Sequence, residues 1–589
     1  MSRTTIRLPG LSREVYQWFF SLAESGVLAP VDWSLSETLL RLAGSVRDPV
    51  RDVLALSSAI VSSSSREGDA LLDLSASGRS SFLDALPGGI PPPSSWAHLL
   101  EELPSLVGSA GCPGPLVLDR GYLYLCRYYL AETRVAASLA RRLLSDFPDS
   151  SPGLPPDNRE SECLDRYFPV RAGVPGEARQ AALSSLSRSL LVLTGGPGTG
   201  KTWTASRIIA LHRALFPSLR IVAVAPTGKA AARMGQAMAE SDLSGDPPPS
   251  MTLHRLLESG SSGFSRNRHN PLDWDFVLVD ELSMIDLPLM DRLLEALPER
   301  SRLVLTGDQN QLASVGAGSV MSDLCSSLSA LPDGTSRKGA LHVLTHNFRQ
   351  SEAGTIREFT RAVAAGAARP ALEILGASPG PGEVEWIDCG SLPEHGSSLP
   401  LSRISDGWAP FSRATSLEEA HRTIGSFMVL SALREGPLGS REINRRVHGQ
   451  RMRRSPSEMR FSPVLILENS YDTGLMNGDL GAESREGLSF EKGGIFLSVL
   501  PRLAPEREYA YAMTVHKSQG SEFDHVLLVF GSVDHPLLTR ALLYTAATRA
   551  RRRLSIWASR EVLERMIQRG SERSSALGER LADLLSERS

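Results

Sequence analysis

The chain is constrained most by one eight-residue segment, in which glycines surround a proline and precede a lysine and a threonine. It follows an apolar run typical of a strand, Leu190–Leu193, and precedes a helical pattern from Trp203 to about Leu215. Glycines let backbone N–H groups turn onto phosphate oxygens, the lysine reaches the outer phosphates, and the threonine hydroxyl can ligate Mg²⁺. Strand, loop and helix in this order predict an ATP site with Mg²⁺, formed by Gly195, Gly196, Pro197, Gly198, Thr199, Gly200, Lys201 and Thr202.

The length of 589 residues is too great for one hydrophobic core and predicts several domains. Hydrophobic residues make up 41% of the chain and the formal net charge is −3, which is typical of a soluble globular protein. Met1–Leu8 is polar and charged and no run of eighteen apolar residues occurs, so we expect a cytoplasmic protein that is not bound to a membrane. The five cysteines are scattered and predict neither a disulfide framework nor a zinc site.

Lysine is rare, because only five of the 63 Lys and Arg residues are lysines. Three of them, Lys201, Lys229 and Lys517, lie in the motifs GTGKT, PTGKA and VHKSQG. A lysine supplies a compact point charge that the planar guanidinium group does not replace, which indicates that these motifs need one. The near-neutral net charge does not exclude nucleic acid as a partner, since a local basic stripe is what binds it.

The first 110 residues predict a mostly helical domain, and residues 111–158 a hairpin, a helix and a linker. We expect helices at Arg13–Ala23, Leu35–Leu42 and Pro49–Ser58, loops at Ser62–Ser65 and Leu86–Ser95, a hairpin at Pro115–Leu125, a helix from Arg127 to about Asp146, and a linker at Asp149–Asn158.

From residue 159 onward, short apolar strands alternate with helices, which predicts two α/β domains in tandem, at 159–340 and 341–589. Residues 441–507 differ in having short β-like runs and many turns, and we expect a small β insertion there. The first domain has strands at Leu190–Leu193, Ile221–Ala225, Phe276–Val279 and Leu303–Thr306, and the second follows Leu341–Leu344 with strands at Phe427–Leu430, Tyr509–Met513, Val526–Phe530 and Leu554–Trp557.

Polar residues follow two of the predicted strands of the first domain. Asp280 and Glu281 end the run Val277–Val279, and Gln311 comes shortly after the strand at Leu303–Thr306. The carboxyl ends of parallel strands meet at one edge of a sheet, beside the phosphate loop. There Asp280 would hold Mg²⁺, Glu281 would orient and deprotonate the attacking water, and Gln311 would reach the γ-phosphate.

Three further motifs combine small hydroxylated residues with a cation, and such groups contact phosphodiester oxygens without distinguishing bases. They predict a DNA-binding set of Thr227, Lys229, Thr252, His254, Thr514 and His516. Ordinary strand-to-helix turns are the alternative for each motif taken alone. Arg349 and Arg549 lie in the second α/β domain, from which an arginine could reach a nucleotide held by the first.

In their order, these motifs resemble those of superfamily-1 helicases, in the branch that translocates 5′→3′. The order is the phosphate loop, PTGKAA, HRLL, DELSM, GDQNQL, NFR, TVHKSQGSEF and YTAATRAR, over Gln180–Arg552. Within that superfamily the chain is similar to RecD-type helicases, the alpha subunits of exonuclease V, through Gly436–Gly439, Leu475–Gly481 and Gly121–Tyr129.

The resemblance implies two RecA-like P-loop NTPase domains with an SH3-like insertion at about 441–507. It implies a short pin, at about 259–270, that meets the duplex junction. It also implies that Gln180 contacts the adenine, Glu522 the ribose, and Arg349 and Arg549 the γ-phosphate.

By resemblance, the chain would be the ATP-driven 5′→3′ helicase subunit of a RecBCD-type complex that processes double-strand ends for recombinational repair. Its partners would be single strands and duplex ends of DNA and the beta and gamma subunits, of the RecB and RecC types, with nuclease activity on another subunit. A partner-dependent subunit is favoured because no helix-hairpin-helix pattern of the stand-alone long form precedes the linker. A stand-alone DNA or RNA helicase and an ATP-binding regulatory subunit without translocation are the alternatives. Glu281 argues against the last, since a binding switch needs no water-activating carboxylate.

Overall fold

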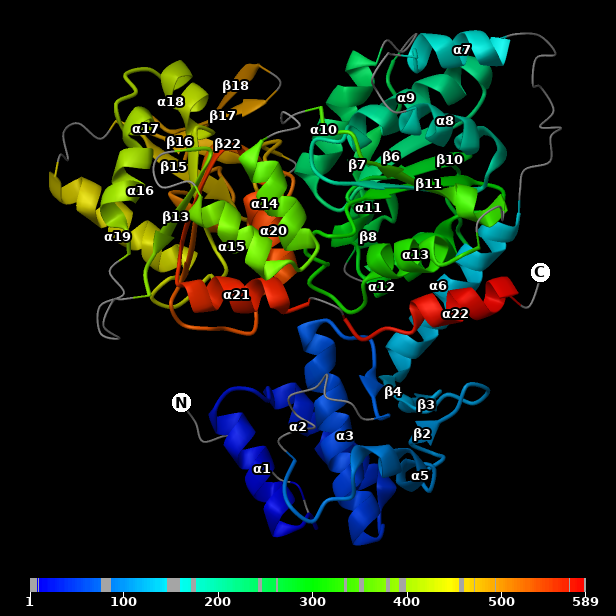
Figure 1. Cartoon of the computed structure of the whole chain (residues 1–589). Coiled ribbons are helices and arrows are strands. Elements are labelled where there is room, and N and C mark those ends of the chain that lie inside the picture. The colour runs from blue at the N-terminus through cyan, green and yellow to red at the C-terminus, as the bar shows by residue number, and fades with distance from the viewer. Residues whose placement is uncertain are drawn as a thin grey trace.

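The computed structural model describes residues 8, 10–75, 86–145, 159–170, 176–241, 246–260, 263–332, 336–348, 354–377, 382–390, 399–454, 460–470, 472–492, 494–570 and 573–586. Two α/β domains lie side by side, and the N-terminal domain lies below them in the view of Figure 1. Within these ranges, no helix combines the length and the apolar character that crossing a membrane requires. The predicted linker at Asp149–Asn158 falls outside the described residues.

The N-terminal domain packs three helices against a small sheet of order β1-β4-β3-β2. Its core holds Val15, Phe19, Leu54 and Trp96, and the predicted hairpin forms from β3 and β4. Its elements are α1 (Arg13–Glu24), α2 (Pro30–Ala43), α3 (Asp48–Glu67), β1 (Leu72–Asp73), η1 (Pro93–Ser95), α5 (Trp96–Leu100), β2 (Val107–Gly108), β3 (Leu116–Asp119) and β4 (Tyr122–Leu125), followed by α6 (Cys126–Leu144).

The predicted loop at Ser62–Ser65 is wrong, because these residues lie inside α3 and are buried there. Serine is unfavourable inside helices when its hydroxyl competes for the hydrogen bonds of the backbone. Here the hydroxyls have other partners. Ser62 Oγ donates to Asp32 Oδ1 of α2 at 2.7 Å, and Ser65 Oγ donates to Val61 O at 2.7 Å. Packing of α2 along α3 therefore extends the helix past the last apolar residue.

The first α/β domain is built on a six-stranded parallel sheet of order β12-β5-β11-β10-β6-β7. The two faces carry separate cores, one against α6, α12 and α13 and the other against α7 and α9. The elements are α7 (Arg159–Tyr167), α8 (Glu177–Ser187), β5 (Leu190–Gly195), α9 (Lys201–Leu215), β6 (Ile221–Ala225), α10 (Gly228–Glu240), β7 (Ser250–Thr252), α11 (Leu253–Leu256), β10 (Phe276–Val279), η2 (Leu282–Met284), α12 (Leu287–Ala296), β11 (Arg302–Gly307), α13 (Val320–Ser329), η3 (Ser336–Ala340) and β12 (Leu341–Leu344).

One detail of this domain differs from the sequence prediction. Leu341–Leu344, which we assigned to the second domain, pairs with β5 in the first sheet, with Leu341 opposite Val192. A four-residue strand, Leu-His-Val-Leu, is too short for its sequence pattern to indicate which of the two sheets it joins. In the pin region, β8 (Ser259–Gly260) and β9 (Gly263–Phe264) form a two-stranded ribbon.

The second α/β domain has a parallel sheet of order β13-β22-β21-β14-β20. Its strands are long apolar runs, and Phe427, Leu528 and Ile556 belong to one large core. The elements are α14 (Thr355–Ala364), α15 (Ala368–Gly376), β13 (Val384–Asp388), α16 (Leu401–Gly407), α17 (Ala409–Ser412), α18 (Leu417–Ile424), β14 (Phe427–Ser431), α19 (Ser440–Arg454), β20 (Ala512–Thr514), η4 (His516–Ser518), β21 (Phe523–Gly531), α20 (Arg540–Ala547), β22 (Ala550–Ala558) and α21 (Arg560–Gln568).

The β insertion is a five-stranded antiparallel sheet of order β18-β17-β16-β15-β19. Its strands are β15 (Ser462–Ile466), β16 (Leu480–Glu483), β17 (Leu488–Lys492), β18 (Ile495–Val499) and β19 (Arg507–Tyr509). The predicted start at Arg441 is wrong, because that segment is the helix α19. Asn444 fixes it to β20, where its Nδ2 donates to Ala512 O at 2.9 Å and its Oδ1 accepts from Ala512 N at 2.7 Å. Whether the sheet is SH3-like stays a prediction.

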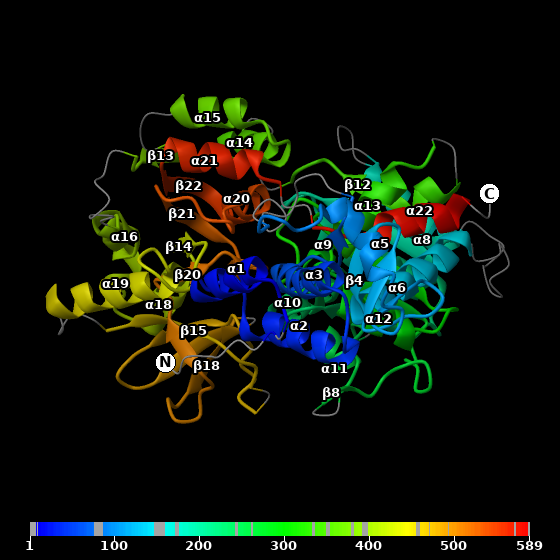
Figure 2. The same ribbon diagram turned by 90° about the horizontal axis from the view of Figure 1, so that it is seen from below.

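The C-terminal segment leaves the second α/β domain and returns to the first. After α21 the chain passes between the α/β domains and the N-terminal domain, and α22 (Leu577–Ser586) lies along α6 (Figure 1). Leu577 and Leu581 enter the core shared by α6 and α13. In the view from below, α22 again lies beside α13, which agrees with this packing (Figure 2). The last helix thus completes the first domain.

Candidate functional site

The phosphate loop joins β5 to α9 and is shaped by left-handed glycines, Gly198 at φ 80° and Gly200 at φ 83°. A Cβ at Gly195 would lie 2.6 Å from Leu344 O, so only glycine fits between the loop and β12. Lys201 Nζ donates to Gly195 O at 2.7 Å and to Gly196 O at 3.0 Å. The lysine therefore lies over the loop. Because α9 begins at this residue, the first N–H groups of the helix lie at the loop without partners inside the helix.

Asp280 and Glu281 end β10 next to this loop, as predicted from the sequence. Thr306 Oγ1 donates to Asp280 Oδ1, and Glu281 N donates to the same oxygen at 3.0 Å. Burial and the Glu281 carboxylate raise the pKa of Asp280, whereas Lys201 acts in the opposite direction. Glu281 has φ 55°, a left-handed conformation that is strained for a residue with a side chain. The two carboxylates and the lysine thus occupy one sheet edge.

The next strand brings a third carboxylate to this edge. Asp308 follows β11, where Oδ1 accepts from Asn310 N at 3.0 Å and Oδ2 accepts from Gln311 Nε2 at 3.3 Å. Tyr544 Oη of the second α/β domain donates to the same Oδ2 at 3.1 Å. Burial raises the pKa of Asp308, and Lys201 opposes that shift. Gln311 is therefore oriented by a carboxylate that also bridges the two domains.

Arg549 is buried in the turn between α20 and β22, close enough to the first domain for the Glu281 and Asp308 charges to act on it. Its Nε donates to Thr545 O at 3.0 Å and its Nη1 to Ser521 O at 3.4 Å. Burial lowers the pKa of Arg549, and the nearby carboxylates of Glu281, Glu522 and Asp308 oppose this. The predicted Arg349 lies outside the described residues. Sequence analysis missed Arg357 and Arg361 of α14, which line a cavity of about 220 Å³ beside Gly196 and Pro197.

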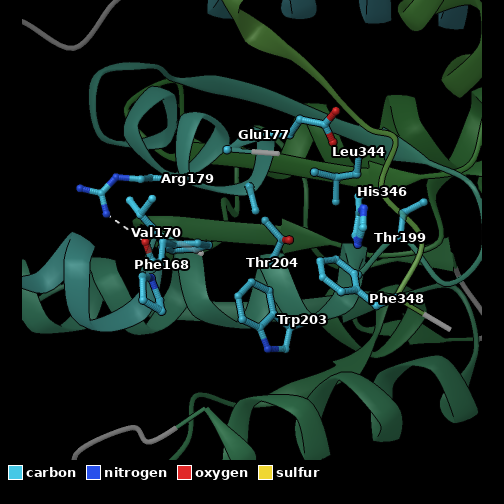
Figure 3. Close-up of a pocket in the computed structure, with 14 residues that line it drawn as sticks. Phe168, Val170, Glu177, Arg179, Thr199, Trp203, Thr204, Leu344, His346 and Phe348 are labelled. Atoms are coloured by element: carbon cyan, nitrogen blue, oxygen red, sulfur yellow. Dashed lines mark hydrogen bonds between the residues drawn. The ribbon is translucent and has the colours of Figure 1, made fainter. Parts of the chain in front are cut away.

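An apolar cavity of about 400 Å³ lies against the phosphate loop at Thr199 and Gly200 (Figure 3). Its walls include Phe168, Trp203 of α9, His346 and Phe348, with Thr199 and Gly200 at the loop. Trp203 meets Phe168 edge-on at 5.9 Å between ring centroids, and Arg207 lies over the Trp203 ring at 4.3 Å. Aromatic faces beside a phosphate loop can hold a flat heterocycle. These residues were missed because nothing in a single sequence shows that they converge.

Gln180 and Glu522 lie outside this cavity. Gln180 is exposed on α8, and its backbone N donates to Gly176 O at 2.9 Å. Glu522 accepts from Arg551 Nε at 3.2 Å and lies 3.7 Å from Arg233 of α10 in the first domain. The roles implied for them, with adenine and ribose, stay predictions.

A second, larger cavity of about 650 Å³ is lined by both α/β domains, the β insertion and the pin. It contains four of the six predicted DNA-binding residues: Thr227, Lys229, His254 and His516. Thr252 and Thr514 do not line it. Their hydroxyls instead accept backbone N–H groups, from Arg255 at 3.3 Å and from Lys517 at 3.4 Å. The two threonines thus stabilise the turns that carry His254 and His516.

Lys229 is not a free surface cation. Its Nζ donates to Ser521 Oγ of the second domain at 2.7 Å, and burial lowers its pKa. Lys517 is similarly held, with Nζ 2.5 Å from Glu508 Oε1. Sequence analysis missed several other residues of this cavity, namely Phe264, Asp286, Arg292, Val315, Asn469 and Asn477. Only Phe264 could have been found, through the pin.

Among the described residues, no group of three or more His, Cys, Asp or Glu side chains could by itself hold a metal ion. Thr202 at the start of α9 and Asp280 are oxygen donors of the kind that Mg²⁺ accepts beside phosphate oxygens. The donor chemistry therefore fits a magnesium ion that arrives with a nucleotide.

Three family models match parts of the chain. They are described as AAA domain over residues 178–317, UvrD-like helicase C-terminal domain over residues 509–557, and RecBCD enzyme subunit RecD, N-terminal domain, over residues 24–124.

Relatives named RecBCD enzyme subunit RecD include one from Mycobacterium tuberculosis, 34% identical across 95% of this chain and 96% of the relative. Another, from Mycolicibacterium smegmatis, is 35% identical across 94% of this chain and 98% of the relative. The ATP-dependent RecD2 DNA helicase of Deinococcus radiodurans is 30% identical across 82% of this chain and 61% of the relative. Among solved structures, Pif1 helicase from Candida albicans has a TM-score of 0.39 at 17% identity, covering 71% of this chain and all of that one (100%).

Proposed function

This chain belongs to the RecD family of RecBCD enzyme subunits, and from that premise we propose that it is an ATP-dependent 5′→3′ DNA helicase subunit of a helicase–nuclease complex that processes double-strand ends. RecD-type and RecD2-type relatives and the helicase family models support an ATP-hydrolysing DNA helicase. Because we propose that it processes double-strand ends of DNA, we also propose that it acts in the cytoplasm, as expected from the sequence.

One segment carries the proposal, because it links the nucleotide edge to the large cavity. Asp308 and Gln311 lie at the nucleotide edge, and Ala313–Gly316 lines the cavity a few residues later. Between them, Leu312 N donates to Thr545 Oγ1 of the second domain at 2.8 Å. A shift of the second domain toward a bound nucleotide would therefore move the cavity wall. This is the connection that a translocase needs between hydrolysis and strand movement.

In the proposed chemistry, the loop amides and Lys201 hold the phosphates, and Thr202 and Asp280 would hold Mg²⁺. The ion, when bound, neutralises charge on the phosphate oxygens. Glu281 orients the attacking water, and Gln311 with Arg549 approaches the γ-phosphate as the domains close. Arg349 is proposed for the same phosphate on the resemblance alone.

The large cavity is proposed to hold a single DNA strand. Its polar groups are hydroxyls, amides, imidazoles, two already paired lysines, the Arg292 guanidinium and the Asp286 carboxylate. The hydroxyls and cations favour contacts with the sugar–phosphate strand. We propose that Phe264, on the pin ribbon, meets the duplex where strands separate.

Titration of labelled oligonucleotides of several sequences, repeated over a range of salt, tests the strand site. We expect affinity to fall with salt and to vary little with sequence. Unwinding of duplexes with a 5′ tail but not a 3′ tail tests the direction. A strong preference for one sequence, or equal use of both tails, would contradict the proposal.

We further propose that the N-terminal domain docks the complex's beta and gamma subunits, of the RecB and RecC types. Phe20 of α1 is 49% exposed and Leu42 of α2 is 64% exposed. The RecD N-terminal family model covers residues 24–124, which include Leu42. Exposed apolar side chains favour a protein contact. Co-expression of Phe20→Glu and Leu42→Glu chains with the neighbouring subunits tests this, and we expect lost co-purification with DNA-stimulated ATPase retained.

The matched control changes exposed apolar residues of the β insertion, Ile495→Glu and Leu503→Glu, which are 73% and 65% exposed in the native chain. Co-purification should survive these changes. If the α1 and α2 variants also co-purified at native stoichiometry, the docking surface would lie elsewhere.

A further inference from the structure

Arg573 of the C-terminal segment holds a loop that lies more than 250 residues earlier in the chain. Its Nη1 donates to Gly318 O at 3.0 Å and also to Gly316 O, and its Nη2 donates to Ser314 O. One guanidinium group therefore binds three carbonyls of the segment Ser314–Gly318. Arg573 itself does not line the large cavity, but Ser314, Val315 and Gly316 do.

The same loop is held from the opposite side by the start of α12. Leu287 N donates to Ala317 O at 3.0 Å, and a Cβ added at Gly316 would overlap the Asp286 carboxylate. The loop is therefore confined between Asp286 and Arg573, with no space for a side chain at Gly316. Burial lowers the pKa of the His516 imidazole, which lines the cavity, and the nearby Arg573 charge adds to that lowering.

The N-terminal domain meets this loop at the same point. Gly318 N donates to Gly68 O at 2.9 Å, and Ala70 N donates to Ser574 O at 2.8 Å. Ser574 N donates to Asp69 Oδ1 at 2.8 Å. A Cβ at Gly68 would lie 2.5 Å from Arg573 Cζ. The end of α3, the C-terminal segment and the cavity loop thus form one three-way joint.

We propose that Arg573 is a positioning residue for DNA binding, which fixes the Ser314–Gly318 wall of the strand cavity and couples it to the N-terminal domain. The inference rests on the proposed function of that cavity. The guanidinium group is required because three carbonyls at different angles need a planar fork of donors, whereas a lysine offers one flexible ammonium. The position of Gly68 makes the N-terminal domain part of this fit.

The experiment measures oligonucleotide affinity and DNA-stimulated ATPase on full-length variants. In Arg573→Gln we expect the DNA concentration for half-maximal stimulation to rise about tenfold, the loss of one set of charge-assisted hydrogen bonds, with kcat at saturating DNA changed less than about twofold. Arg573→Lys should recover part of the affinity. A general loss of structure would lower kcat and affinity together and would not be rescued by lysine.

Arg580→Gln is the matched control. Arg580 is another arginine of the C-terminal segment, buried where Arg573 is half-buried, with its Nε 2.9 Å from Glu132 Oε1 and its Nη2 2.6 Å from Asp119 Oδ2. It bonds neither the Ser314–Gly318 loop nor any residue named as lining the large cavity. It should lower the unfolding temperature and leave DNA affinity unchanged. Equal losses of affinity in the Arg573→Gln and Arg580→Gln chains would overturn the proposal.

Gly68→Ala tests the coupling from the N-terminal domain, since its methyl group would displace Arg573. We expect weaker DNA binding, as in Arg573→Gln. Gly44→Ala is its control, because Gly44 also ends a helix with positive φ, 67°, and has nothing within 4 Å of its would-be Cβ. Unchanged DNA affinity in Gly68→Ala would overturn the coupling.

His254→Ala separates this inference from the proposed function, since His254 lines the cavity directly. If neither the unaltered chain nor any variant bound oligonucleotides, the proposed function and the inference would both be wrong. If His254→Ala weakened binding and Arg573→Gln did not, the inference alone would be wrong.

Discussion

The Tyr544 hydroxyl donates to Asp308 Oδ2 at 3.1 Å, across the boundary between the two α/β domains and over 236 residues of chain. Asp308 also orients Gln311, and Tyr544 lies on the helix that leads to Arg549. Burial raises the pKa of Tyr544, and the Asp308 carboxylate adds to that shift, so the phenol stays a donor. The contact therefore links the two sides that must close on a nucleotide.

Replacing Tyr544 by Phe removes this donor and leaves a buried carboxylate with one partner fewer. We expect a loss of about 1–2 kcal/mol in the free energy of unfolding and weaker stimulation of ATP hydrolysis by DNA. Denaturant unfolding and ATPase assays measure both. Tyr122→Phe is a control, since Tyr122 Oη donates to Glu579 Oε1 of α22 at 2.9 Å in an exposed position, away from the boundary between the α/β domains. Full DNA stimulation in Tyr544→Phe would show that the contact does not couple the domains.

Lys201→Gln and Glu281→Gln should both abolish ATP hydrolysis, for different reasons. Loss of the lysine removes a phosphate contact and weakens nucleotide binding. Loss of the carboxylate removes the group that activates water and should slow turnover about 100- to 10,000-fold while ATP stays bound. Steady-state ATPase and equilibrium binding of a fluorescent ATP analogue distinguish the two. Near-native turnover in Glu281→Gln would rule out its assignment as the base.

Arg549→Ala should reduce turnover about 1,000-fold or more, because an arginine inserted from a second domain acts mainly on the transition state, and ATP affinity should change little. The measurement is steady-state ATPase at saturating single-stranded DNA. Arg552→Ala, at an exposed position of the adjoining strand β22, should behave like the unaltered chain. Equal turnover in the two variants would show that Arg549 contributes to packing and not to catalysis.

The aromatic cavity makes a separate prediction about the nucleotide base. Trp203→Ala should raise the KM for ATP about tenfold by removing a stacking face, with a smaller effect on kcat. Gln180→Ala decides between the cavity and the resemblance, since Gln180 lies outside the cavity. If only Gln180→Ala raised KM and relaxed the preference for ATP over GTP, the base would lie at Gln180.

Asp323→Asn should change how stability depends on pH. Burial raises the pKa of Asp323 to about 7, above the value of about 3.9 for an unfolded aspartate. The stability of its neutral form is therefore present below about pH 4 and is lost as pH rises toward 7. The asparagine variant stays neutral, so its unfolding temperature should exceed that of the unaltered chain increasingly up to pH 7. Asp472→Asn, at an exposed position, should show no such trend.

The sequence was sufficient for what depends on local pattern. The apolar runs that became β5, β6, β10 and β11 had to be buried parallel strands, and the groups after them had to meet at one edge. The predictions of a loop at Ser62–Ser65 and of a β insertion starting at Arg441 were wrong. Both polar segments are helical because they have tertiary partners, Asp32 and Ala512 respectively.

What could not be predicted joins residues far apart in the chain. Lys229 was predicted from its motif to contact DNA, but nothing in the motif indicates its bond to Ser521, 292 residues away. The aromatic cavity draws Phe168, Trp203 and Phe348 from three separate segments. Composition and spacing carry no information about such convergence, because each contact depends on how two finished domains pack.

The bridge formed by the C-terminal segment also sets an order of events during synthesis. Glu132 of α6 is fully buried and accepts from Tyr124 Oη at 3.0 Å, Ser575 Oγ at 3.0 Å, Ala576 N at 3.1 Å and Arg580 Nε at 2.9 Å. Three of these four donors are translated more than 440 residues after it. At about 5–20 residues per second, α6 waits tens of seconds on the ribosome before its carboxylate can be enclosed. In a nascent or truncated chain without α22, the surface of α6 around the Glu132 carboxylate would stay uncovered, and chaperones and proteases can recognise it.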